Sequence, residues 1–165
     1  MESPLIISNT TPLLNFAEIG RMELLVALFG KLVIPPAVAA ELTAKPGLFP
    51  NAARVPTLPG ISALAPVDRP LVKGLTSRVH RGEAECLALA LERPDSLLLL
   101  DDLAARELAA TNGLRYTGTL GCLAEARQRG LISAIEPLLA ELRVKARFWI
   151  SDRLADRVLR AAGER

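Results

Sequence analysis

Four consecutive leucines, Leu97 to Leu100, constrain the fold of this chain more than any other feature. Two aspartates, Asp101 and Asp102, follow the leucine run directly. A short, continuous apolar run that ends in polar residues is typical of a strand inside a parallel sheet, where helices cover both faces. The run therefore predicts a central strand with a helical layer on each side.

Further segments with the character of strands alternate with segments of helical character. The expected strands are residues 4–9, 32–34, 96–100 and 114–117, and the expected helices are 10–19, 22–29, 37–44, 71–79, 82–92, 103–111, 118–129, 135–145 and 152–162. The first helix has Thr10 or Thr11 as its expected N-cap. Strands that alternate with helices are joined by right-handed crossovers into a parallel sheet. We therefore predict an α/β fold, a three-layer α/β/α sandwich around a mostly parallel sheet.

The length of 165 residues fits one domain, which we expect to span residues 1–165. Residues 35–70 hold eight of the twelve prolines, so we expect a Pro-rich loop insertion at about 45–70. The mean hydropathy is positive, which indicates that some apolar surface is buried against a partner chain. We expect this partner to be a second copy of the chain, in a homodimer.

Nothing in the sequence indicates a membrane protein or an exported protein. No apolar run approaches the roughly 20 residues that cross a bilayer, and the N-terminus lacks the features of a signal peptide. Cys86 and Cys122 lie far apart and outside any CxxC pattern, so we expect no disulfide and no zinc site. Cys86 is expected to be a small core residue. A cytoplasmic location is the expectation.

Polar residues follow three of the expected strands. They are Ser8, Asn9 and Thr10 after the first strand, Asp101 and Asp102 after the leucine run, and Thr117, Gly118 and Thr119 after the last strand. The carboxyl ends of parallel strands share one edge of a sheet, where function gathers. Glu41 lies in the helix after the second strand, and Glu83 opens the helix that leads to the leucine run. Acidic side chains gathered at this edge would repel one another, and Mg²⁺ or Mn²⁺ would relieve the repulsion and activate water for attack on phosphorus.

Each of these acids also has a purely structural interpretation. Glu41 could be an ordinary solvated helix residue, and Glu83 could complement a helix dipole. One of Asp101 and Asp102 could cap the following helix and leave the other for the site, and we favour Asp101 for the site.

Three other polar residues are expected outside the chemistry. Glu85 and Glu107 are assigned to surface or ion-pairing roles. His80, the only histidine, lies between Arg78 and Arg81 and is expected on the surface rather than as a general base.

Five blocks of the sequence, in order, resemble a known family. They read IISNTTPLLNFAEIGRMELLVALFG, LVIPPAVAAEL, RGEAECLALAL, LLLLDDLAARELAATNGLRYTGTLGCLAEARQRGLI and LLAELR. Together they resemble the PIN-like proteins grouped as the domain of unknown function 3368. The likeness runs nearly end to end and is weakest at residues 45–75.

The resemblance implies a parallel-sheet nuclease fold with an acidic tetrad that binds Mg²⁺ or Mn²⁺. By motif position, the four tetrad places fall on Asn9, Glu41, Glu83 and either Asp101 or Asp102. Asn9 stands where the family usually has Asp, so the site has one negative charge fewer and should hold the cation less tightly. The reading SNTTP is also found in this subfamily. The segment TGTLG lacks the additional acid of some PIN proteins, and Thr117 and Thr119 offer hydroxyls there instead.

Many PIN proteins are toxins of toxin–antitoxin pairs that cleave RNA. The resemblance therefore implies a metal-dependent RNA endonuclease restrained by a small antitoxin protein. Arg78, Arg81 and Arg106 are the basic residues expected to contact the RNA backbone. Residues 143–165 carry seven Lys and Arg against three Asp and Glu, a balance of +4, which suits RNA or an acidic partner as well as a solvated helix.

Other functions fit the sequence less well. The leading alternative is a PIN-like scaffold with weakened chemistry that acts by protein association, a hypothesis motivated by Asn9 and the positive hydropathy. A phosphoacceptor domain would need its acidic pair after the first strand and a lysine at a later strand end. A dinucleotide-binding domain would need G-x-G-x-x-G after the first strand, which the sequence lacks.

Overall fold

The structure, a computed structural model, describes residues 3–165. Its strands are β1 (Ile6–Ser8), β2 (Leu32–Ile34), β3 (Ile61–Ala63), β4 (Leu97–Leu99) and β5 (Arg115–Thr117). Its helices are α1 (Thr10–Glu18), α2 (Met22–Phe29), α3 (Pro36–Thr43), the 3₁₀-helix η1 (Ala52–Thr57), α4 (Arg69–Leu75), α5 (Arg81–Glu92), α6 (Leu103–Thr111), α7 (Thr119–Gln128), α8 (Glu136–Lys145) and α9 (Asp152–Ala161).

The five strands form one parallel sheet in the order β3-β2-β1-β4-β5. In the register of the two central strands, Ile6 lies opposite Leu97 and Ser8 lies opposite Leu99. The strands β1 and β4 therefore end at the same level, and the residues that follow them meet at one edge. The predicted parallel sheet, with the leucine run near its centre, is confirmed.

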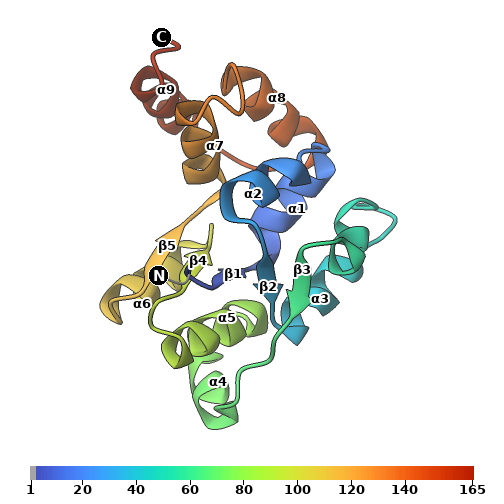
Figure 1. The fold of residues 1–165 in the computed structure, drawn as a ribbon, viewed down its shortest axis with the longest axis vertical. Helices are drawn as coiled ribbons and strands as arrows, with labels where there is room; N and C mark the ends of the chain where they lie inside the picture. Colours follow the sequence, from blue (N-terminus) through green and yellow to red (C-terminus); the bar gives the residue numbers. More distant parts are fainter. Residues whose placement is uncertain (1–2) are drawn as a thin grey trace.

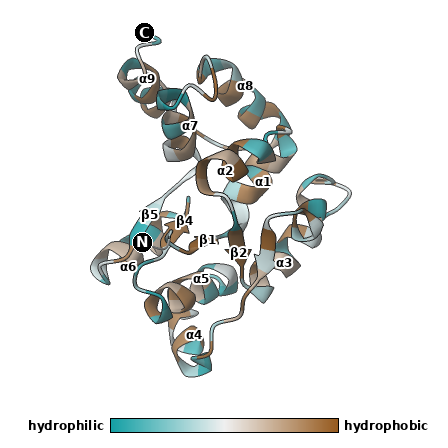
Figure 2. Ribbon diagram, in the orientation of Figure 1, coloured by the Kyte–Doolittle hydropathy of each residue, from teal (hydrophilic) through white to brown (hydrophobic). Residues whose placement is uncertain are grey.

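Helices cover both faces of the sheet (Figure 1). On one face lie α1, α2 and α7, with α8 and α9 beyond them, and on the other lie α5 and α6, with α4 outside α5. The strands β1 and β2 and the helix α2 are strongly hydrophobic (Figure 2). Leu98, Leu99 and Leu100 are completely buried, as a strand covered on both faces requires. The three-layer α/β/α sandwich expected from the sequence is thus the observed architecture.

The Pro-rich segment contributes more to the fold than the expected loop. It contains η1 and the edge strand β3, which pairs in parallel with β2. The amide of Leu32 donates to the carbonyl of Gly60, and the amide of Leu64 donates to the carbonyl of Ile34. The sequence does not predict β3 because the strand is short, and because an edge strand with one covered side lacks a continuous apolar run.

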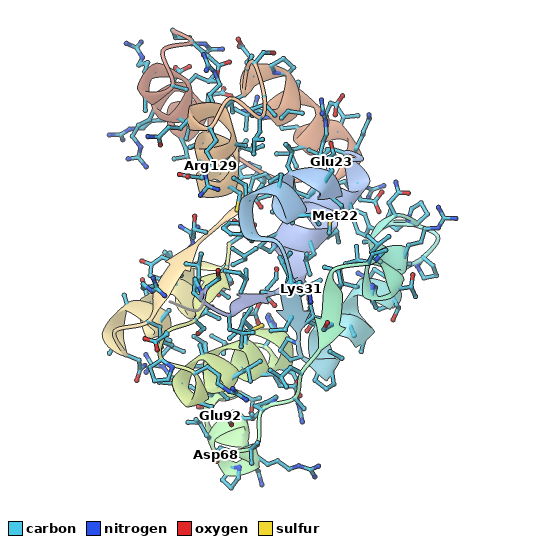
Figure 3. The ribbon with its side chains drawn as sticks, viewed as in Figure 1. Met22, Glu23, Lys31, Asp68, Glu92 and Arg129 are labelled. Carbon is cyan, nitrogen blue, oxygen red and sulfur yellow. The ribbon has the colours of Figure 1, made fainter. Side chains whose placement is uncertain are left out.

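Carboxylates that are buried or half-buried connect elements that are distant in the sequence. Glu18 accepts a hydrogen bond of 2.8 Å from the amide of Ala52 and so joins α1 to η1. Glu92, at the end of α5, accepts from the amides of Val67 and Asp68 at 2.7 and 2.9 Å, just before α4 (Figure 3). Such bonds give a partner to amides that lie before the first turn of a helix or at its start.

Glu85 is a third such carboxylate, and of its two expected roles, a surface position or an ion pair, it has the second. Its expected ion pair is present, since the Nε atom of Arg81 lies 3.3 Å from Oε1. The residue is nevertheless only 6% exposed, and Oε2 accepts a hydrogen bond of 2.8 Å from the amide of Ala37. Helix α3 begins with Pro35 and Pro36, which offer no capping side chain, so Glu85 of α5 supplies the acceptor.

Replacing Glu85 with alanine is therefore expected to lower the free energy of unfolding by about 1–3 kcal/mol, because the amide of Ala37 would lose its buried partner. Urea denaturation measures this change. The control is Glu107→Ala, since Glu107 is exposed on α6 as expected and its replacement should change stability by less than about 0.5 kcal/mol. Equal effects of the two substitutions would contradict the capping role of Glu85.

Candidate functional site

Asn9 lies directly after β1, at the edge where the central strands end. Its amide donates to the carbonyl of Leu99 at 3.0 Å, so it continues the pairing of β1 with β4. Asn9, rather than the expected Thr10 or Thr11, occupies the N-cap position of α1, but its side chain makes no capping bond. The side chain instead donates from Nδ2 to Oε1 of Glu83 at 3.1 Å. A favoured capping residue is thus directed away from its helix and towards an acid of α5.

Two oxygens of this pair have no hydrogen-bond partner within residues 3–165. They are Oδ1 of Asn9 and Oε2 of Glu83, and both are buried. The nearest cationic candidate is the Nδ1 atom of His80, 3.7 Å from Oε2 of Glu83, on a side chain that is 92% exposed. A buried acceptor without a donor costs about 1–3 kcal/mol. Two such oxygens on adjoining side chains fit a divalent cation, because Mg²⁺ and Mn²⁺ prefer oxygen ligands.

Glu41 reaches the same place from α3. Its carboxylate accepts a hydrogen bond from the hydroxyl of Thr10, the residue after Asn9. It also lies against Gly82, since a Cβ atom built on that glycine would be 2.7 Å from Oε1 of Glu41. Glu83 follows Gly82 in the first turn of α5. The structure thus brings together Asn9, Glu41 and Glu83, three side chains that are remote in the sequence.

The electrostatics of α5 agree with this convergence. Cys86, one turn after Glu83, is fully buried, as expected for a core residue, and burial raises the pKa of its thiol well above the ordinary value. The negative charges of Glu83, Glu41 and Glu85 raise this pKa further. All three carboxylates are therefore close enough to this turn of α5 to raise the pKa of Cys86.

Asp101 lies two residues beyond the end of β4 and is held at the start of α7. Its carboxylate accepts hydrogen bonds from the amide of Thr119 at 2.8 Å and from the hydroxyl of Thr119 at 2.6 Å. Asn15 of α1 completes the arrangement by donating to the same hydroxyl at 3.0 Å. Burial raises the pKa of Asp101, while the bonds from Thr119 and the charge of Arg106 act in the opposite direction.

Asp102 has a structural task. It is the N-cap of α6, and its Oδ1 atom accepts a hydrogen bond of 2.9 Å from the amide of Ala105. Of the two adjacent aspartates, Asp102 therefore caps the helix and Asp101 turns to the strand edge, the division of roles that the sequence analysis favoured.

Arg106 stands beside Asp101 at the same edge. Its Nε atom donates to the carbonyl of Leu100 at 2.7 Å, and its guanidinium lies 5.5 Å from the ring centre of Tyr116. Gly118 leaves the space for this arrangement, because a Cβ atom there would meet the Arg106 guanidinium and lie 2.5 Å from Oδ1 of Asp101. The two terminal nitrogens of this guanidinium can donate hydrogen bonds to a further acceptor.

The other polar residues expected near the site lie partly on the surface and partly within the ends of the strands. Arg78 is exposed, and Arg81 is exposed while paired with Glu85. Ser8 is buried, and its hydroxyl donates to the carbonyl of Asn9 at 2.9 Å. The carbonyl of Thr117 accepts from the amide of Leu100, which ties β5 to the end of β4.

The acids do not form a complete protein-only metal cage. Across residues 3–165, no three Asp, Glu, His or Cys side chains lie close enough together to hold a metal ion. Two neighbouring groups are present instead: Asn9, Glu41 and Glu83 around α5, and Asp101 with Thr119 at the start of α7. Such an arrangement suits Mg²⁺, which commonly takes one or two carboxylates and completes its shell with water and substrate phosphate.

Comparison with known families agrees with the fold. The model of a family described as a PIN domain, the domain of unknown function 3368, matches residues 5–164. The chain belongs to the PIN domain family. A PIN domain has a nuclease-type fold, and PIN domains generally use divalent metals. No curated protein and no solved structure matches the chain.

Among the residues that the structure describes, this PIN domain has no helix that is long and apolar enough to span a membrane.

The raised pKa of Asp101 gives a pH-dependent prediction for the metal-free PIN domain. A carboxyl whose pKa is higher in the folded than in the unfolded state destabilises the fold as it ionises, so stability is lost as pH rises through the folded pKa. Replacing Asp101 with asparagine removes this loss. In urea denaturation with a chelator, the stability of Asp101→Asn relative to wild type should be greater at about pH 7.5 than at about pH 4. A relative stability that is constant over this range would contradict the assignment.

Proposed function

We propose that this PIN domain is an Mg²⁺- or Mn²⁺-dependent RNA endonuclease and the toxin of a toxin–antitoxin pair. The observation that carries the proposal is the pair of unpartnered buried oxygens, Oδ1 of Asn9 and Oε2 of Glu83, beside the carboxylate of Glu41. An edge built for stability alone would give these oxygens donors. A divalent cation is the partner that both the oxygens and the family favour.

Asn9, Glu41 and Glu83 are the residues proposed to hold the cation directly. Asp101 supplies further negative charge from the neighbouring strand end, and Asp102 is left to cap α6. When bound, such a cation lowers the pKa of a bound water and stabilises in-line displacement at phosphorus.

Arg106 is the basic residue best suited to bind an RNA phosphate at this edge. Two contacts hold its guanidinium, one with the carbonyl of Leu100 and one with the ring of Tyr116, so little freedom is lost when it meets an anion. Arg78 and Arg81 flank the start of α5 and are proposed to contact the RNA backbone farther along the strand.

The proposed partners are a small antitoxin protein and a second copy of the chain. Val144 and Trp149 support association, since these apolar side chains are 79% and 83% exposed within the basic segment 143–165. Sedimentation equilibrium of the wild type and of Trp149→Ser tests the homodimer, and a monomer at all concentrations would exclude it.

The catalytic proposal predicts metal-dependent cleavage of single-stranded RNA by the purified protein. Cleavage should occur with Mn²⁺ and stop with a chelator, and Glu83→Gln should lower the rate at least about 100-fold, because several kcal/mol of transition-state stabilisation depend on the cation. Glu107→Gln, on the exposed face of α6, is the matched control and should cleave like the wild type. Equal survival of RNA with Mn²⁺ and with chelator would contradict the proposal.

A scaffold with weakened chemistry is the second candidate function. It is favoured by the neutral side chain of Asn9 and by the lack of three converging acids within residues 3–165. Such a protein would use the same fold to bind a partner without cleaving RNA.

Asn9→Asp separates the two candidates. In a metal-dependent enzyme, the added carboxylate should tighten Mn²⁺ binding about tenfold or more, because a further charged ligand is supplied. Without metal, the same variant should be less stable than the wild type, since the bond from Nδ2 to Glu83 becomes a repulsion between carboxylates. Isothermal titration with Mn²⁺ and urea denaturation with a chelator measure the two effects. Unchanged metal binding and unchanged RNA cleavage would favour the scaffold.

A further inference from the structure

We propose that Gly82 is a positioning residue for Glu41. Its missing side chain leaves the space in which the Glu41 carboxylate lies against the first turn of α5, next to Glu83. The link to metal binding rests on the proposed function, whereas the positioning itself does not.

The contact between Gly82 and Glu41 leaves no room for a methyl group. A Cβ atom on Gly82 would lie 2.7 Å from Oε1, 2.8 Å from Oε2 and 3.0 Å from Cδ of Glu41. All three distances are to the carboxylate, and its two oxygens lie nearest to the place where a side chain at position 82 would begin. Separations of roughly 3.5–4.0 Å are the optimum between non-bonded carbon atoms, so any larger residue would displace the carboxylate.

Backbone conformation does not explain a glycine at this place. Six glycines of the described chain have positive φ angles, and Gly82 is not among them. In a helix, alanine is more favourable than glycine by up to about 1 kcal/mol. Gly82 therefore serves no turn, and the space that it leaves for Glu41 is what the structure gains.

Two contacts together fix a side chain that would otherwise be mobile. Glu41 is an exposed residue of α3, and ordering a Glu side chain costs up to about 2 kcal/mol of rotamer entropy. The hydroxyl of Thr10, in α1, donates a hydrogen bond to the Glu41 carboxylate, and Gly82, in α5, leaves the space in which the carboxylate lies. Because Thr10 follows Asn9 and Gly82 precedes Glu83, the two contacts hold Glu41 beside the pair with the unpartnered oxygens.

The substitution Gly82→Ala tests this role without removing a charge. The clashing atoms end a flexible side chain, so Glu41 should swing away while the fold stays intact. We expect the unfolding equilibrium constant to be unchanged or shifted towards the folded state, and the Mn²⁺ dissociation constant to rise about tenfold, as for the loss of one ligand. The matched control is Gly74→Ala, at a helical glycine of α4 where a Cβ atom would meet nothing within 4 Å. Wild-type Mn²⁺ affinity in Gly82→Ala would overturn the proposal.

A double-mutant cycle with Glu41→Ala shows whether the effect passes through Glu41. In the Glu41→Ala background, Gly82→Ala should change Mn²⁺ affinity by less than about twofold, since the side chain that it displaces is gone. The same loss of affinity in both backgrounds would assign the effect to α5 itself and contradict positioning.

A metal-free measurement keeps the positioning role separate from the proposed function. With a chelator present, the coupling between Thr10→Val and Glu41→Ala is measured by urea denaturation in the wild-type and in the Gly82→Ala backgrounds. We expect a coupling of about fivefold in the unfolding equilibrium constant in the wild type, the contribution of one hydrogen bond, and none after Gly82→Ala. A coupling that survives Gly82→Ala would overturn the positioning role. A wild type that binds no Mn²⁺ would refute the proposed function alone.

Discussion

The parallel pairing of β1 with β4 is the constraint on which the site depends. It places Ser8 opposite Leu99, and the amide of Asn9 extends the ladder by one bond to the carbonyl of Leu99. The chain leaves both strands at the same level, so Asn9 and Asp101 reach one edge although 91 residues separate them. A slip of one residue in this register would turn the leucines of β4 to the opposite faces and carry Asp101 away from the edge.

Several residues at this edge depart from the local rules of helix capping and of buried hydrogen bonding. Asn9 occupies an N-cap without capping, and its oxygen is buried without a donor. Gly82 stands in a helix where alanine would be more stable. By contrast, Asp68, Asp102 and Ser151 all cap their helices with side-chain hydrogen bonds. Residues that break such rules are expected to cluster at functional sites, where the ability to bind a ligand costs some stability.

The sequence predicted the elements well because most of them carry strong local signals. The leucine run, the glycines after helices and the polar strand ends all depend on residues close together in the chain, and the bounds of α2, β2 and α6 agree with the prediction. Contacts between remote residues could not be predicted in this way. The capping of α3 by Glu85, the bond from Asn15 to Thr119 and the packing of Glu41 on Gly82 join helices whose relative placement no local pattern specifies. The edge strand β3 was missed because its pairing with β2, rather than its own composition, makes it a strand.

The neutral side chain of Asn9 lets the fold accommodate the buried carboxylate of Glu83 when no metal is bound. Glu83 is 9% exposed, and an aspartate at position 9 would set a second carboxylate against its Oε1 atom, a repulsion that only a cation or a proton relieves. The side-chain amide of Asn9 donates to that oxygen instead, and its own oxygen would serve as a neutral ligand of the proposed cation. The exchange lowers the charge that attracts a cation and also lowers the free energy needed to keep the site assembled before the cation arrives. Under the proposed function, asparagine at position 9 would thus give an edge that is assembled before the cation binds and that attracts the cation less strongly.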